Sequence, residues 1–353
     1  MKVLQFILLV LAFSRVCHSD IQFSGFASVV GGQTISGNND AFLADYSLVG
    51  VYDDELNFQP ETTLGLQARS DLGDGLSFVV QWIARGLDGF NSEVNYAYLS
   101  YELTANLMLQ AGRKRLPLQY YSEFFDVGFS YPWIRPPADL YTWQILNYNG
   151  MSLVHKSRVG EGALNTSVYL GREESKNNKL LSTFFFAEPT NEEWKNILGI
   201  SADYSINNLQ ALLSYTNFKL DRVFTSPTTT QTNLSNSNVD FVAASLNFDN
   251  GNYFVLSEWN QWISARFATR NWLVSAGVRH GHYTPYIALS EFNQDEKIAN
   301  EELEEHTTSS LGFRWDFHPQ AAFKIQFDDI QDKGTLGLVG DAQALTFGVD
   351  LVF

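Results

Sequence analysis

The chain has 353 residues and a formal net charge of −16, with 39 acidic against 23 basic side chains. This balance argues against nucleic acid as a partner, because phosphate backbones are bound through surfaces rich in Lys and Arg. Cys17 is the single cysteine, which excludes a disulfide framework and a thiolate metal site.

The first predicted element is an export signal over residues 1–19. Lys2 precedes a short apolar run, and small residues stand three and one before Asp20, which is the layout of a cleavable signal peptide. The run is too short to cross a hydrocarbon core as a helix, which takes about 20 residues. We therefore expect a mature chain 20–353 with 21 basic against 39 acidic residues. An acylated Cys17 is the alternative.

From residue 21 onward, apolar and polar residues alternate in short runs. Clear examples lie at 21–29, 64–69, 76–85, 311–317 and 323–328. A period of two places each set on its own face of a strand, so one face is apolar and aromatic while the other carries amides, hydroxyls and charges. No stretch approaches the length of about 18 consecutive apolar residues that a transmembrane helix needs. Alternation alone would also fit a soluble sandwich.

Short turns and long loops alternate along the chain. The candidate short turns are 72–75, 104–106, 157–162, 206–208, 249–252, 280–285 and 318–320. The candidate long loops are 32–60, 86–93, 115–148, 172–195, 218–238, 261–269, 293–308 and 329–342. Seven turns and eight loops join sixteen strands, an even number that is typical of outer-membrane barrels. The sequence therefore predicts an all-β fold: a transmembrane antiparallel β-barrel of about sixteen strands, with short periplasmic turns and long extracellular loops.

The loop at 115–148 is the longest predicted connection, and it is apolar rather than polar. A long loop without secondary structure in a compact domain is usually functional. Its aromatic side chains must be buried, and we expect them to fold into the mouth of the barrel. The candidate constriction residues on this loop are Glu123, Asp126, Tyr131, Trp133, Arg135 and Asp139.

The opposing wall is expected to be polar and largely basic. Strand parity makes Arg69, Gln81, Arg85, Arg279, Arg314 and Lys324 the lumen-facing candidates. At a rise of about 3.3 Å per residue, only Arg314 and Lys324 fall near the middle of their strands. Two interpretations stay open for these cations. They face the acidic loop across a constriction, or they pair with Asp316, Asp328 or Asp350 on adjacent strands.

No motif predicts enzymatic chemistry. The sequence lacks Gly-x-Ser-x-Gly, His-Glu-x-x-His and a phosphate-binding loop. His280 and His282 share a face and would bind a metal only weakly, because two ligands fall short of a usual site. We therefore expect no catalytic residue, no metal and no cofactor. A membrane-embedded hydrolase barrel remains the alternative from a different class.

The ordered set of motifs resembles the Gram-negative porin family. The matching segments are Gly-Arg-Lys-Arg-Leu-Pro at 112–117, Gly-Val-Arg-His-Gly at 277–281, Gly-Phe-Arg-Trp-Asp-Phe at 312–317, and the terminal Phe353. They correspond to the top of the fifth strand, the turn between the twelfth and thirteenth strands, the fourteenth strand and the assembly signal. The resemblance spans the whole of 20–353.

The resemblance implies a passive, water-filled channel for ions and small hydrophilic solutes in the outer membrane. The implied partners are membrane lipid, lipopolysaccharide, two further copies in a homotrimer, and the barrel-assembly machinery, which would recognise Phe353. One departure concerns 86–93, which is short where general porins carry a longer loop that latches onto a neighbouring subunit. A solute-selective channel of the sugar type is the rival with the same fold.

Overall fold

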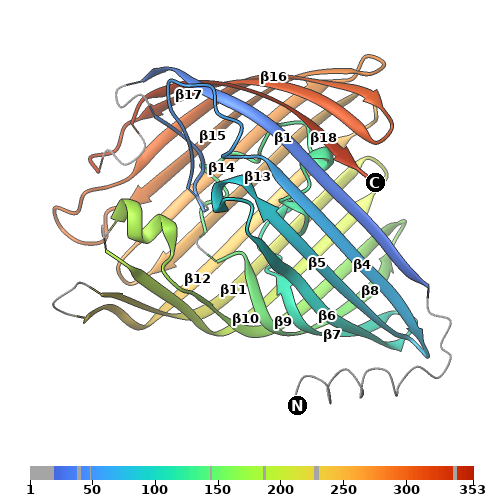
Figure 1. Ribbon diagram of the computed structural model, residues 1–353. Helices are drawn as coiled ribbons and strands as arrows, with labels where there is room; N and C mark the ends of the chain where they lie inside the picture. The colour runs from blue at the N-terminus through green and yellow to red at the C-terminus, as the bar shows by residue number, and fades with distance from the viewer. Residues whose placement is uncertain are drawn as a thin grey trace, which may run out of the picture.

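The structure is a computed structural model (Figure 1) that describes residues 20–353 except 38–40, 48, 144, 186–187, 226–229 and 337–339. The expected export signal at 1–19 lies outside the described residues, so its cleavage stays a prediction. Within the described ranges, no helix is both long enough and apolar enough to cross a membrane.

Sixteen antiparallel strands close into one barrel (Figure 1). The wall is formed by β1 (Ile21–Gly37), β4 (Thr63–Gly73), β5 (Leu76–Arg85), β6 (Ser92–Thr104), β7 (Leu107–Arg115), β8 (Asn147–Val159), β9 (Gly162–Ser175), β10 (Thr190–Ile206), β11 (Leu209–Thr225), β12 (Thr230–Asp249), β13 (Tyr253–Ser264), β14 (Ala268–Val278), β15 (Tyr283–Asp295), β16 (Glu305–His318), β17 (Ala321–Asp332) and β18 (Ala342–Val352). Each strand pairs with its neighbours in the chain, and β18 returns to β1. The predicted sixteen-stranded antiparallel barrel is confirmed.

Alternation along each strand separates an apolar outer wall from a polar interior. On β17, Lys324 and Asp328 are buried inside the barrel, whereas Ile325 is exposed on its outer wall. Exposed aliphatic side chains such as Leu213 and Ile287 continue this outer surface around the barrel. Such a wall is unfavourable in water, but lipid solvates it, and closure pairs the backbone groups that an open sheet would leave free.

The first and last strands of the barrel meet at its seam. β1 pairs with β18 on one side and with β4 on the other. Beyond β18, the backbone of Phe353 exchanges two hydrogen bonds with Gly25, of 2.8 and 3.0 Å. The Phe353 ring lies against Gly25 so closely that a Cβ there would stand 2.5 Å from it. A side chain at position 25 would therefore force the Phe353 ring or the Gly65 carbonyl, 2.8 Å away, to shift.

Short turns and long loops occupy opposite ends of the barrel, as predicted (Figure 1). The long loops carry the hairpin β2 (Phe42–Asp45) with β3 (Gly50–Tyr52), the 3₁₀ turns η1 (Gly86–Asp88), η2 (Ser122–Phe124) and η3 (Gly128–Ser130), and the single-turn helix η4 (Leu181–Phe185). Several expected loops are shorter than predicted. The clearest case is 218–238, because β11 runs to Thr225 and β12 starts at Thr230.

Candidate functional site

The connection between β7 and β8, residues 116–146, folds into the interior of the barrel, and we call it the inserted loop. Its ends are joined by a hydrogen bond of 3.0 Å from the Leu116 amide to the Leu146 carbonyl. Leu118, Trp133 and Leu140 on this loop are fully buried. The position of the loop inside the barrel explains how its apolar side chains are buried.

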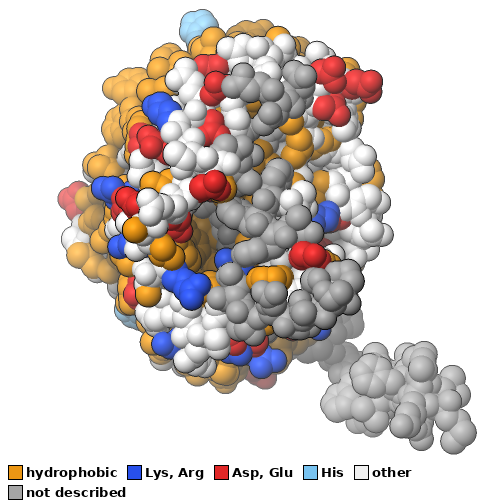
Figure 2. Space-filling model, turned by 90° about the vertical axis from the view of Figure 1, so that its left-hand side faces the viewer, with side chains coloured by type: hydrophobic (Ala, Val, Ile, Leu, Met, Phe, Trp, Pro, Cys, Tyr) orange, Lys and Arg blue, Asp and Glu red, His pale blue; other side chains and the backbone are white. Residues whose placement is uncertain are grey.

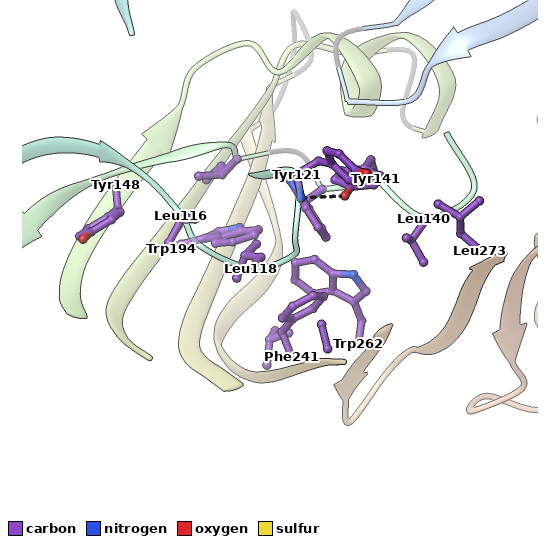
Figure 3. Packing of buried hydrophobic residues seen from close by; sticks show 14 of the residues in the cluster. Leu116, Leu118, Tyr121, Leu140, Tyr141, Tyr148, Trp194, Phe241, Trp262 and Leu273 are labelled. Carbon is purple, nitrogen blue, oxygen red and sulfur yellow. Dashed lines mark hydrogen bonds between the residues drawn. The ribbon is translucent and has the colours of Figure 1, made fainter. Parts of the chain in front are cut away.

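Aromatic side chains pack one side of the inserted loop against the inner wall of β10 to β15 (Figure 3). Trp143 contacts Phe241 and Trp262, with ring centroids 5.4 and 5.9 Å apart. The Tyr141 hydroxyl accepts a hydrogen bond of 3.1 Å from the Tyr121 amide (dashed in Figure 3) and donates one of 2.9 Å to Glu258. An apolar cluster therefore occupies part of this half of an otherwise polar interior.

On β16 and β17, basic side chains hold the backbone of the inserted loop. Lys324 donates to the carbonyls of Gly128 and Trp133, both at 2.6 Å, and forms an ion pair of 2.8 Å with Asp350. Arg314 donates to the carbonyls of Phe129 and Tyr131, at 2.8 and 2.9 Å.

Arg314 also pairs with Asp316 at 2.7 Å. Of the two interpretations left open by the sequence, pairing with an aspartate on an adjacent strand describes Lys324 with Asp350, whereas Asp316 lies on the same strand as Arg314. The Lys324 ammonium and the Nη1 of Arg314 also donate to carbonyls of the inserted loop.

On the opposite side, Asp126 joins the inserted loop to β5 and β7. Its carboxylate pairs with Arg85, at 2.9 Å, and with Arg115. All three side chains are at most 7% exposed. Burial favours the neutral acid, but the guanidinium groups of Arg85 and Arg115 hold the pKa of Asp126 below its usual value. The predicted loop acid and wall base are thus in direct contact.

Arg135 connects the inserted loop to two further parts of the molecule. It forms a bidentate pair with Glu61, at 2.5 and 2.8 Å, and a third bond of 2.7 Å to Asp328 on β17. Burial opposes the charged form of Arg135, but these two carboxylates raise its pKa, so it stays a cation.

Asp139 is buried against β15 and β16. Its carboxylate accepts hydrogen bonds from Ser290, at 2.5 Å, and contacts His306 Nδ1 at 2.6 Å. His306 Nε2 lies 3.2 Å from Glu304, which also accepts a bond of 2.7 Å from the Tyr46 hydroxyl. This cluster ties the inserted loop to the first and seventh long loops.

The other predicted residues have different surroundings. Glu123 is exposed and faces a cavity that Lys114 also lines. Gln81 is buried in the wall, bonded to Gln67 and Asn95. Tyr131 and Trp133 are both buried, and the Trp133 Nε1 donates to Ser275 at 3.0 Å. Arg69 is exposed on β4, and Arg279 pairs with Asp249 at the rim formed by the short turns.

Sequence reasoning missed several partners of the inserted loop. The missed partners are Glu61, Arg115, Glu258, Ser290 and His306. Strand parity places Glu258 on the inner face of β13 and Ser290 on the inner face of β15. Polar residues at these positions indicate that they face the lumen and not lipid. No local pattern marks Glu61, because its partner Arg135 lies on a different loop.

The inserted loop separates two groups of cavities. On the side of the long loops lies a cavity of about 300 Å³, which we call the outer cavity, bordered by Leu181, Ile298 and Glu301. On the side of the short turns lie two cavities of about 590 and 340 Å³, which share Tyr120, Phe124 and Gln210 and which we call the inner chamber.

A small cavity lies between the inserted loop and β1, β4 and β5. It amounts to about 60 Å³ and is bordered by the pairs of Arg85 with Asp126 and of Arg135 with Glu61. The opposed charges expected from the sequence therefore hold the loop to the wall here.

Acidic side chains are spread around the rim formed by the long loops (Figure 2). Exposed acids on the first loop include Asp53, Asp54 and Glu55. In the part of the chain that the structure describes, no group of three or more His, Cys, Asp or Glu side chains is arranged to hold a metal ion.

Comparison with known proteins finds similarity in fold. No family model matches the sequence, and no curated protein matches it. Among solved structures, OmpF of Salmonella typhi in complex with daunomycin superposes with a TM-score of 0.63 at 13% identity, over 95% of this chain and 98% of that one. The outer-membrane channel DcaP of Acinetobacter baumannii gives 0.62 at 11%, over 95% and 97%.

A trimer form of OmpT, an outer membrane protein of Vibrio cholerae, gives a TM-score of 0.58 at 10% identity, over 95% of this chain and 99% of that one. At these identities the likeness shows that the chain has the fold of outer-membrane porins, along nearly its full length.

Proposed function

We propose that the chain forms a passive channel for ions and small hydrophilic solutes in the outer membrane of a Gram-negative cell. The observation that carries this proposal is the polar interior of a closed barrel with an apolar outer wall, narrowed by a loop folded inside it. An apolar wall of this kind requires lipid around it. A polar lumen lined by amides, hydroxyls and charges offers water and solutes favourable contacts.

The same proposal includes partners. The outer wall contacts membrane lipid, the acidic rim lies where divalent cations bridge lipopolysaccharide, and Phe353 is recognised by the barrel-assembly machinery. We also propose a homotrimer, supported by the shared fold with a trimeric OmpT form. The second long loop spans only 86–91 between β5 and β6, so the trimer would be held by the barrel walls rather than by a latch.

The lumen does not favour an enzyme. Ser290, Asp139 and His306 are the three residue types of a hydrolytic triad, but Ser290 donates to Asp139 instead of to His306. Both ring nitrogens of His306 contact carboxylates. Ser290 thus does not contact the imidazole that takes the proton of the nucleophile in such a triad. We therefore propose a tethering role for this cluster and a non-enzymatic channel.

Ion conduction through a planar bilayer tests this function. The unaltered protein is compared with a variant in which residues 120–140 are replaced by a short Gly-Ser linker, and with a preparation from cells that lack the gene. We expect discrete current steps from the unaltered protein, and steps several-fold larger from the shortened variant. Absence of steps in both proteins would reject the channel. Equal steps would mean that the inserted loop does not set the constriction.

A further inference from the structure

The walls of the outer cavity are largely aromatic. Trp194 stacks on Phe218 with ring centroids 4.0 Å apart and an angle of 14°. Trp262 stands edge-on to both, at 5.6 and 6.1 Å. Phe267 and Phe292 complete the apolar surface. Pockets for small molecules are typically lined this way, with a few polar groups that fix the ligand.

Two polar groups at the outer cavity lack partners. Among the described residues, the buried Nε1 of Trp262 and the buried Oε2 of Glu301 have no hydrogen-bond partner. Both residues line the cavity, and Trp262 is only 6% exposed. Buried polar groups are nearly always hydrogen-bonded, so each needs an explanation. One of them can only donate and the other only accept.

The remaining carboxylates of the outer cavity are already engaged. Glu192 accepts bonds of 2.7 Å from Trp194 Nε1 and from Arg222. Glu304 accepts a bond of 2.7 Å from Tyr46 and contacts His306. The cavity therefore does not gather free negative charge, as a site for an organic cation would.

A hydroxyl group matches this pair of unsatisfied atoms, because it accepts from an indole N–H and donates to a carboxylate. An ammonium group could satisfy Glu301 but could not accept from Trp262. An anion could accept from Trp262 but would be repelled by Glu301. The flat aromatic faces add a surface for the C–H face of a ring.

We propose that the outer cavity binds a neutral carbohydrate of one or two rings, with hydroxyl groups bonded to Trp262 Nε1 and Glu301 and a ring face on the aromatic wall. This inference deepens the proposed channel function and rests on it, since a solute that enters from the long-loop side would meet this cavity before the inserted loop. The volume of about 300 Å³ lies at the lower end of the range for small-molecule sites.

Maltose is the probe for the first test, measured by titration calorimetry on detergent-solubilised protein and by block of ion current in a bilayer. Sorbitol supplies hydroxyl groups without a ring, and phenyltrimethylammonium supplies an aromatic cation. We expect saturable binding and current block by maltose, and neither by the two control compounds. Binding of the cation in preference to maltose would overturn the proposal, as would equal heats from maltose and sorbitol.

Substitutions assign the binding to the outer cavity. Trp262→Phe keeps an aromatic ring and removes the donor, and we expect it to weaken maltose binding about tenfold. Glu301→Gln keeps an acceptor oxygen, so we expect a smaller loss for maltose. The matched controls are Trp82→Phe on the outer wall, where Trp82 is 41% exposed, and Glu302→Gln beside the cavity. Unchanged maltose affinity in Trp262→Phe would refute the site.

The two proposals fail separately. Ion current without sugar tests the channel, and heat of maltose binding in detergent tests the cavity. Current steps without maltose binding reject the carbohydrate site and leave the channel standing. Maltose binding without current steps supports the site and rejects the channel. Unchanged current steps in Trp262→Phe show that this variant has folded.

Discussion

Asp126 is the residue on which two buried arginines depend. Its carboxylate is shared by Arg85 and Arg115, and Arg85 has Glu93 as a second partner at 2.5 Å. In an environment of low dielectric constant, a buried charge that loses its partner is costly, even where the intact pair adds little net stability. The effect of removing Asp126 should therefore exceed that of removing an exposed acid.

We predict that Asp126→Asn loosens the inserted loop. Removing one partner of a buried ion pair costs about 3–5 kcal/mol, with part of that loss relieved by Glu93. The expected result is noisier single-channel current and faster chymotrypsin cleavage within 116–146. Glu123→Gln is the matched control, because Glu123 is exposed on the same loop. Equal noise and equal cleavage in the two variants would contradict the assigned tether.

The same carboxylate predicts a dependence on pH. Because Arg85 and Arg115 lower the pKa of Asp126 in the folded protein despite its burial, its contribution to loop stability is complete above about pH 4 and is lost as the pH falls through the lowered pKa. Current noise should stay constant from about pH 7 to pH 4 and rise only below that. A transition centred above pH 5 would show that another group controls the loop.

At the scale of elements, the alternation of residues was enough to predict strands, and the count of turns and loops was enough to predict their number. The ends of strands were not, as β11 and β12 illustrate. Their ladder continues through polar pairs such as Lys219 with Asn238, because backbone pairing does not need the apolar residues by which the sequence marks a membrane span. The pattern of apolar residues therefore predicted the membrane-spanning part of β11 and β12, but not the polar parts that extend beyond it.

The candidate site was predicted in part. The inserted loop stood out because an aromatic surface loop is unfavourable in water. Its tethers could not be predicted, since strand parity gives the face of a residue and not its partner. Lys324 illustrates this: its position inside the barrel follows from alternation, but its bonds to Gly128 and Trp133 depend on how the loop is folded.

The last strand gives a prediction of its own. Deletion of Phe353 removes two backbone hydrogen bonds to Gly25 and the ring that covers it, and we expect slower assembly and lower amounts in the outer membrane. Phe353→Ala keeps the backbone bonds and separates their role from that of the ring. Normal amounts of the deletion variant at high expression would argue against an assembly signal.

At the scale of the whole molecule, the acidic rim and the tethered lumen act over different distances. Most wall cations near the inserted loop are neutralised by contact, whereas Asp53, Asp54 and Glu55 are exposed at the mouth. Exposed charges are screened within about 8 Å at physiological salt and within about 30 Å at 0.01 M. The rim should therefore influence ions mainly at low salt.

We predict a preference for cations that strengthens as salt is lowered and fades near 1 M. Reversal potentials across a salt gradient measure it, at low and at high mean concentration. Replacing Asp53, Asp54 and Glu55 by their amides should reduce the preference at low salt only. A preference for anions at both concentrations would mean that wall cations, and not the rim, control the current.

The tethers of the inserted loop differ greatly in their separation along the chain. Asp126 and Arg115 are 11 residues apart, whereas Gly128 and Lys324 are 196 apart. Contacts between distant residues form late, because the loop-closure entropy must be overcome first. We therefore expect substitutions at Arg115 to slow refolding and substitutions at Lys324 mainly to speed unfolding. Two tethers that hold neighbouring positions of the inserted loop, Asp126 and Gly128, would thus form at different stages of folding.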